Sequence, residues 1–143
     1  MANAQPDLIA SAEAAISFGD LDPMGIVWHG NYYRLMELGR EAFGRAYGLD
    51  AMELHAQGLF TPIVRSTIEH KAPLVYGDTA IVRARYVPDP AAKIILHYEL
   101  LNKASGAVVA TGTTVQVFLD RERKLLLTMP AVYAAWIAKH VVR

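Results

Sequence analysis

The sequence contains no cysteine, which excludes disulfide bonds, thiolate metal sites and cysteine nucleophiles. A chain without cysteine fits a reducing compartment, so we expect a cytoplasmic protein. An excess of one charge is also missing, because 14 Lys and Arg residues balance 14 Asp and Glu residues. Nucleic-acid-binding domains usually carry a basic excess, and anionic membranes attract basic surfaces. We therefore expect neither nucleic acid nor a membrane as a partner.

Long apolar runs are absent as well. No stretch approaches the roughly 20 apolar residues that cross a bilayer, and residues 1–10 lack the basic start and apolar centre of a signal peptide. The chain nevertheless has 53% hydrophobic and only 20% charged residues over 143 positions. This composition predicts one folded domain, residues 1–143, with a loose lead-in over residues 1 to about 11. High apolar content in so short a chain also suggests burial against other subunits.

The spacing of apolar residues predicts one long helix from Asn31 to about Tyr47. Apolar residues recur there at intervals of three and four, the period of one helix face. Asn31 is the expected N-cap and Gly48 the expected end of the helix. The recurring positions are Tyr32, Leu35, Met36, Gly39, Ala42, Phe43, Ala46 and Tyr47.

After Gly58 the apolar period changes to two, which predicts strands at about 60–70, 79–88, 93–102 and 106–119. A first strand is expected at 13–18, and a C-terminal helix from 131 to about 142, starting near Pro130. Short connections around residues 76–78, 88–90 and 102–106 favour antiparallel neighbours. The predicted class is α+β, with the long helix packed on one face of an antiparallel sheet.

Side chains able to do chemistry gather in residues 18–33, FGDLDPMGIVWHGNYY. Asp20 and Asp22 stand in a turn before the helix, and His29 and Gly30 stand where the helix begins. A helix N-terminus presents unpaired N–H groups and a positive dipole end, which stabilise an oxyanion. A nearby carboxylate can attack a carbonyl or activate water, and glycine leaves room for that approach. The pattern by itself also fits an ordinary structural turn.

The same segment resembles the active-site segment of the 4-hydroxybenzoyl-CoA thioesterase family of hotdog-fold proteins. In that family a run Phe/Tyr-x-Asp-x-Asp-x-x-Gly-(Ile/Val)-Val-(Trp/Tyr)-(His/Tyr)-x-Asn-Tyr leads from the first strand into the central helix. Residues 58–64, GLFTPIV, more weakly resemble the strand that faces the active site in aromatic acyl-CoA thioesterases. The resemblance implies a hotdog fold and hydrolysis of an aromatic or short-to-medium-chain acyl-CoA. The matching residues are Phe18, Asp20, Asp22, Gly25, Ile26, Val27, Trp28, His29, Asn31 and Tyr32.

When the roles of the family's residues are carried over by position, the resemblance implies that Asp22 is the nucleophile or general base. It also implies that the His29 backbone N–H is the oxyanion donor. The His29 side chain is expected to orient the thioester, as in the short-chain acyl-CoA branch, whereas the 4-hydroxybenzoyl branch more often has tyrosine there. Asp20 is expected to cap the turn. The substrate-binding candidates are Trp28, Gly30, Asn31, Tyr32, Thr61 and Lys93. Lys93 is preferred as a CoA phosphate ligand over Arg83, Arg85, Arg121, Arg123 and Lys124.

The resemblance also implies a homodimer or homotetramer with the active site between subunits. No metal or redox cofactor is expected, because CoA enters as part of the substrate. Four histidines show no metal-ligand spacing and are interpreted as structural or surface residues: His55, His70, His97 and His140. Two alternatives stay open, a thioesterase for acyl-carrier-protein substrates and a non-catalytic acyl-binding protein of the same fold.

Overall fold

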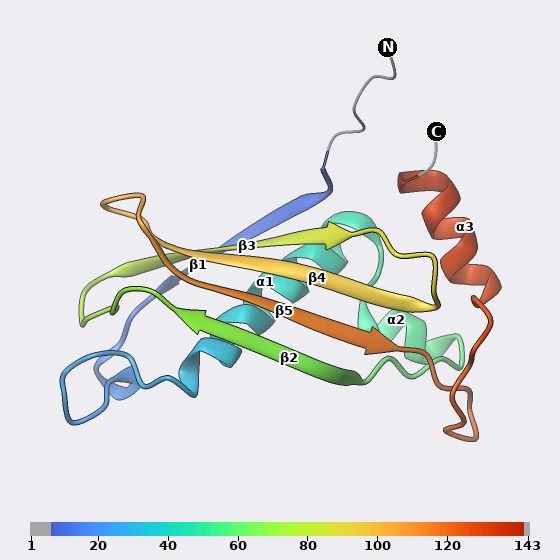
Figure 1. Cartoon of the computed structure of the whole chain (residues 1–143), viewed down its shortest axis with the longest axis horizontal. Helices are drawn as coiled ribbons and strands as arrows, with labels where there is room; N and C mark the ends of the chain where they lie inside the picture. The colour runs from blue at the N-terminus through green and yellow to red at the C-terminus, as the bar shows by residue number, and fades with distance from the viewer. Residues whose placement is uncertain (1–6, 142–143) are drawn as a thin grey trace, which may run out of the picture.

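A computed structural model describes residues 7–141 (Figure 1). Its helical segments are the 3-10 turn η1 (Phe18–Asp20) and the helices α1 (Asn31–Tyr47), α2 (Ala51–Ala56) and α3 (Ala131–His140). Its strands are β1 (Ile9–Ala15), β2 (Ile63–His70), β3 (Thr79–Val87), β4 (Lys93–Asn102) and β5 (Val108–Val117). The predicted class, one long helix on an antiparallel sheet with a C-terminal helix, is confirmed. Within the described range, no helix is both long and apolar enough to cross a membrane.

The five strands form one antiparallel sheet in the order β1-β3-β4-β5-β2. Every second residue of β3 and β4 is buried, because side chains alternate between the two faces of a strand. Val82 and Ala84 on β3 and Leu96 and Tyr98 on β4 therefore line the face that carries the core. β2 pairs only with β5, so it forms one edge of the sheet.

α1 lies across one face of the sheet and packs mainly on β1 and β3 (Figure 1). Leu35, Met36 and Phe43 repeat at helical spacing and are almost fully buried. Gly39 allows the close approach, since a Cβ at this position would lie 2.8 Å from Cγ1 of Val82. The helix ends at the predicted Gly48, whose φ of 81° lies in the left-handed region that glycine adopts without strain.

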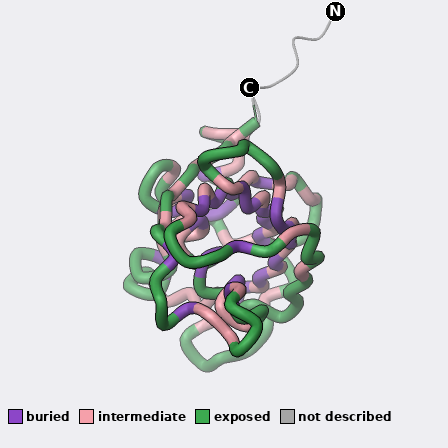
Figure 2. Tube along the Cα trace, turned by 90° about the vertical axis from the view of Figure 1, so that its left-hand side faces the viewer, coloured by how far each residue is buried: buried purple, intermediate pink, exposed green. Residues whose placement is uncertain are grey.

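α3 packs beside the C-terminal end of α1 through aromatic side chains. The indole Nε1 of Trp136 donates to the carbonyl of Tyr47 at 2.7 Å, and the Tyr133 hydroxyl donates to the carbonyl of Lys93 at 2.6 Å. Burial, together with the hydrogen bond to Tyr86, raises the pKa of Tyr133, so its hydroxyl remains a donor. Figure 2 shows the buried positions gathered in the interior, with exposed loops around them.

Two predicted boundaries at the N-terminal side were wrong. The first strand begins at Ile9 and ends before Phe18, so residues 9–11 are paired with β3 instead of forming a loose lead-in. Small residues dominate this strand, and they give little periodic contrast for a sequence pattern to detect. The N-cap of α1 is Gly30, one position before the predicted Asn31.

The prediction that residues 76–78 join two neighbouring strands was also wrong. β3 is already flanked by β1 and β4, so β2 pairs with β5 at the opposite edge and the 71–78 connection passes between non-adjacent strands. The short helix α2 was not predicted, because its six residues are too few for a helical period. Its N-cap is Asp50, whose side chain accepts the N–H groups of Met52 and Glu53.

We predict that Gly39→Ala destabilises the protein even though alanine favours helices. The higher helix propensity of alanine stabilises the fold by up to about 1 kcal/mol. Overpacking of the new methyl group against the buried Val82 destabilises it by about 1–3 kcal/mol. Urea unfolding followed by circular dichroism measures the difference. Val82→Ala in the same chain should relieve the contact, so the double variant should lose less stability than the sum of the single ones. A Gly39→Ala variant more stable than the wild type would contradict this packing.

Candidate active site

The segment before α1 folds into a small hairpin that presents Asp22. The Asp22 N–H donates to the Ile26 carbonyl at 2.8 Å, and the Gly25 N–H donates to the Asp22 carbonyl at 2.9 Å. The Asp22 side chain accepts the Met24 N–H at Oδ1, also at 2.8 Å. Among residues 7–141, Oδ2 of Asp22 makes no hydrogen bond, so one carboxylate oxygen remains available at a half-buried position.

Asp22 lines a cleft of about 410 Å³ together with His29, Tyr32 and His70. The cleft lies between the loop before α1 and the C-terminal end of β2. The His70 ring lies edge-on to the Tyr32 ring, with centroids 4.7 Å apart, and burial raises the pKa of Tyr32. The other lining residues are Met24, Ile26, Val27, Lys71, Ala72 and Pro73. A second cleft, of about 390 Å³, lies between α1, α2 and the inner face of β4 and β5, and neither Asp22 nor His29 lines it.

Two backbone N–H groups just before α1 have no acceptor within residues 7–141, and one of them belongs to His29, which lines this cleft. Within the described residues, the backbone N–H groups of His29 and Gly30 donate to no acceptor, whereas those of Trp28, Asn31 and Tyr32 are bound to backbone carbonyls. Unpaired N–H groups and the positive end of the helix dipole favour a negatively charged oxygen nearby. The residue with the available carboxylate and a residue with an unpaired N–H thus line one cleft, as an acyl-transfer reaction requires.

The space beside Gly30 is filled by the Trp28 ring. A Cβ at Gly30 would lie 2.3 to 2.8 Å from three atoms of that ring, and the Trp28 and His29 rings have centroids 5.2 Å apart. The absence of a side chain at Gly30 therefore accommodates Trp28, which in turn lies against His29. Trp28 is nevertheless 48% exposed.

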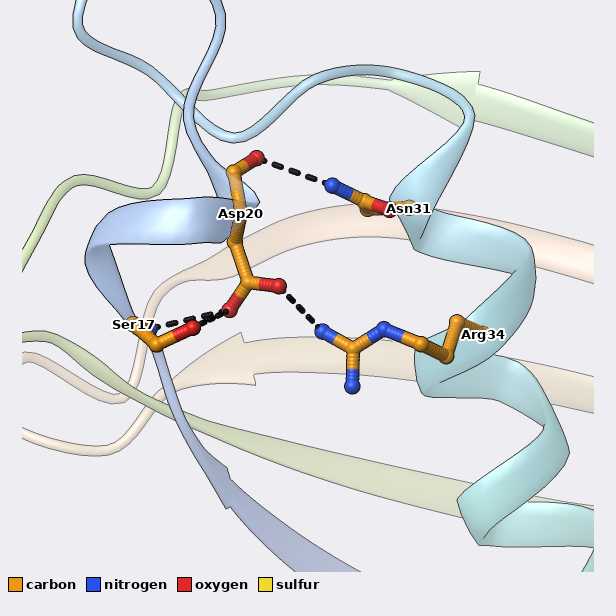
Figure 3. A network of polar contacts seen from close by, with 4 residues as sticks. All are labelled: Ser17, Asp20, Asn31 and Arg34. Atoms are coloured by element: carbon orange, nitrogen blue, oxygen red, sulfur yellow. Dashed lines mark hydrogen bonds and ion pairs between the residues drawn. The ribbon is translucent and has the colours of Figure 1, made fainter.

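Asp20 is buried in a polar network at the start of α1 (Figure 3). Its Oδ2 accepts the backbone N–H and the hydroxyl of Ser17 at 2.9 and 3.0 Å, and Arg34 donates to its Oδ1 at 2.5 Å. The Asn31 side chain donates to the Asp20 carbonyl at 2.9 Å. Burial alone would raise the pKa of Asp20, but the Ser17 hydrogen bonds and the Arg34 guanidinium outweigh it and lower the pKa. The prediction that Asp20 caps the turn is confirmed.

Of the six predicted substrate-binding residues, only Tyr32 lines this cleft. Trp28, Gly30 and Asn31 flank His29 at the start of α1 without lining the cleft, and Thr61 and Lys93 lie elsewhere in the chain. Thr61 borders a hollow of about 290 Å³ with Phe60 and Arg123, before the N-terminal end of β2. Lys93 begins β4, with an exposed side chain and a carbonyl bonded by Tyr133. Their roles stay predictions. In the described part of the chain, no group of three or more His, Asp or Glu side chains could hold a metal ion.

His70 and Lys71 line the cleft but were not among the predicted site residues. His70 was interpreted as structural or surface, because it is distant in sequence from the motif and no local pattern marks it. Only the position of β2 brings this residue to the start of α1. The alternation along residues 63–70 could have placed His70 on the same strand face as Ile68, but not beside Asp22.

Comparison with known proteins gives the class of this molecule. Residues 16–137 match the model of the thioesterase-like superfamily. A Bacillus subtilis protein named "Putative acyl-CoA thioesterase YneP" is 31% identical over 114 residues, which cover 80% of this chain and 82% of the relative. The solved structure of a gentisyl-coenzyme A thioesterase is 27% identical with a TM-score of 0.73, covering 86% of this chain and 98% of that one.

The fold agrees with more distant structures as well. A 1,4-dihydroxy-2-naphthoyl-CoA thioesterase from Synechocystis superposes with a TM-score of 0.79 at 20% identity, over 91% of this chain and 96% of that chain. The chain belongs to the thioesterase-like superfamily. It is a thioester hydrolase with the hotdog fold, which the resemblance in its sequence had implied.

We predict that Gly30→Ala displaces the Trp28 ring without unfolding the protein. The Gly30 backbone has φ −64°, which alanine adopts freely, so the ring must move to admit the new methyl group. The chain has two tryptophans, and NMR resolves their indole N–H signals. The Trp28 signal should shift while that of Trp136 stays in place.

Gly19→Ala is the matched control, because a Cβ there would meet no atom within 4 Å. It should move neither indole signal. An unchanged Trp28 signal in Gly30→Ala would show that the ring does not rest on Gly30.

Proposed function

We propose that the protein hydrolyses an acyl-CoA thioester to the free acid and CoA, with Asp22 as the nucleophile or general base. The observation that carries this proposal is the shared cleft of Asp22 and His29 at the start of α1. In the proposed reaction the unpaired His29 N–H binds the carbonyl oxygen of the thioester. The names of the Bacillus subtilis relative and of the gentisyl-coenzyme A thioesterase support an acyl-CoA substrate.

The proposed reaction uses two groups of the cleft, the Asp22 carboxylate and the His29 N–H. Asp22 either adds to the thioester carbonyl carbon itself or takes a proton from a water that adds instead. The oxygen of the tetrahedral intermediate becomes negative, and the N–H of His29 with the dipole of α1 stabilises it. Collapse breaks the C–S bond, and the CoA thiolate leaves and takes up a proton. On the direct route, water then hydrolyses the mixed anhydride and restores Asp22.

The cleft suits an aromatic or short-to-medium acyl group. Its lining combines the rings of Tyr32 and His70 with the apolar Ile26 and Val27, in a volume of about 410 Å³. Two structurally similar proteins are named for aromatic acyl-CoA substrates. In this proposal CoA is part of the substrate, and no metal or redox cofactor takes part. A cytoplasmic location stays a prediction.

We predict that Asp22→Asn lowers kcat by roughly 10²- to 10⁴-fold with the fold intact. Asparagine retains an Oδ1 that accepts the Met24 N–H, so the hairpin keeps its geometry while the reactive carboxylate is lost. Turnover is measured with a thiol reagent on acyl-CoA thioesters from acetyl to palmitoyl and on benzoyl-CoA. Matched carrier-protein thioesters in the same assay show whether CoA is the preferred carrier.

Asp89→Asn is the control, because Asp89 makes the same kind of contact, accepting the Ala91 N–H at 2.8 Å, in another turn. It should retain wild-type turnover. Wild-type turnover in Asp22→Asn would end the proposal. The two routes for Asp22 differ in water labelled with oxygen-18, since a single turnover can place label in the Asp22 carboxylate only if that carboxylate attacked directly.

We also propose that two chains pair through β2 to form at least a dimer. β2 is an edge strand with exposed Ile63 and Val64, and unpaired strand edges readily bind another strand. Its last residue, His70, lines the cleft. In an antiparallel pair across a two-fold axis, the start of one strand lies beside the end of the other. The partner subunit's Thr61 would then approach this chain's His70. In this arrangement Thr61 could take the substrate-binding role that we predicted for it.

We predict that Thr67→Glu, in the middle of β2, dissociates the oligomer, because like charges face each other near the two-fold axis. Light scattering should show a monomer, and turnover should fall with it. Ser11→Glu adds the same charge to an exposed position of the other edge strand, β1, and should leave the oligomer intact. A wild-type protein that is monomeric at every concentration tested would refute the dimer.

A further inference from the structure

The segment that carries the proposed chemistry has little core packing to hold it. Between Asp20 and Asn31 only Val27 is buried, and Pro23, Met24, Trp28 and other residues are exposed. A segment with so few buried contacts is free to shift unless polar bonds restrain it. Hydrogen bonds are therefore the main restraints on this segment, and one of them joins its middle to the fold, where the Val27 N–H donates to the Leu74 carbonyl at 2.9 Å.

Asp20 supplies two further bonds, which hold the end of the segment that leads into α1. Its carbonyl accepts the Trp28 N–H and the Asn31 side-chain amide, each at 2.9 Å. Trp28 and Asn31 bracket His29, and Asp22 follows Asp20 by two positions. The Asp20 carbonyl thus connects the part of the chain that carries Asp22 with the part that carries His29.

The carboxylate of Asp20 anchors this backbone group to the fold. It is held by Ser17 at the end of the first strand and by Arg34 on α1 (Figure 3). Arg34 lies one helical turn after Asn31, so both side chains extend from the same face of α1 toward Asp20. We call the residues Ser17, Asp20, Asn31 and Arg34 the Asp20 clamp.

We propose that the Asp20 clamp is a positioning device for the reaction, which keeps the His29 N–H and the Asp22 carboxylate at the separation that the thioester needs. The inference rests on the proposed function. Arg34 acts in this proposal as a positioning residue, because its Nη2 donates to Oδ1 of Asp20. Catalytic groups displaced by even 1 Å lose much of their rate advantage.

Arg34→Ala tests the clamp. The Arg34 side chain is 54% exposed, and Asp20 keeps both of its hydrogen bonds from Ser17 when Arg34 is removed, so the variant should fold. With the acyl-CoA that the wild type turns over best, kcat should fall roughly 10- to 100-fold while KM changes little. Guanidinium ion, added far below denaturing concentrations, should restore part of kcat by occupying the position beside Asp20. Hydrogen exchange should speed up in residues 20–31 and not in β3–β5.

Arg45→Ala is the matched control, because Arg45 makes an exposed ion pair with Glu41 at 2.6 Å on the same helix. It should keep the wild-type kcat and show no effect of guanidinium. If Arg34→Ala does not fold, Asp20→Asn tests the clamp through kcat, KM and hydrogen exchange without guanidinium, since it keeps the size of the side chain and removes its charge. A wild-type kcat in folded Asp20→Asn would overturn the inference.

Unchanged kcat in Arg34→Ala overturns the inference, and so does a rise in KM at constant kcat, which would make Arg34 a substrate ligand. A kcat loss that only follows the loss of folded protein, without guanidinium rescue, also overturns it. Failure of the proposed function is seen separately, because Asp22→Asn would then keep its turnover whatever happens in Arg34→Ala.

Discussion

The packing of α1 on the sheet is the constraint on which the site depends. The helix rests on β1 and β3 through Leu35 and Phe43, and Gly39 lets it approach Val82 closely. This fixes where the N-terminus of α1 lies, next to the end of β2. An N-terminus carries unpaired N–H groups and a positive dipole end wherever it is placed. The core packing gives this property a defined location, at the mouth of a cleft.

Two carboxylates close together in sequence have different roles because their surroundings differ. Asp20 is buried, and its charge is balanced by Arg34 and bonded by Ser17, which lowers its pKa and occupies its oxygens. Asp22 is only half-buried, and one of its oxygens accepts a single N–H from Met24. A fully engaged carboxylate stabilises structure, whereas a partly engaged one keeps lone pairs for chemistry. In the proposed reaction, the same motif thus combines an anchor, Asp20, with the reactive carboxylate of Asp22.

The edge position of β2 links the fold to assembly. Pairing with β5 leaves the other side of β2 without a partner strand in the described chain, and the strand ends at His70 in the cleft. An edge with exposed apolar residues is a liability for a monomer. In a dimer it would be covered, and the cleft would border a second subunit. Thr61, which lies apart from Asp22 within one chain, becomes relevant to the site only in such an arrangement.

Local patterns were sufficient for the longer elements and for the motif, but not for the short helix α2. The helical period of residues 31–47, the alternation of the strands and the Asp20–Asp22 turn before the helix depend only on neighbours in sequence, and the structure has them close to the predicted positions. Strand order could not be predicted in this way, because pairing depends on which strand occupies the second side of β3. The same holds for His70 and for the contact of Trp28 with Gly30. The sequence by itself determined the class of fold and marked the residues that we propose to react. Only the tertiary structure decided which side chains meet at the cleft, because those contacts join segments that the chain does not place side by side.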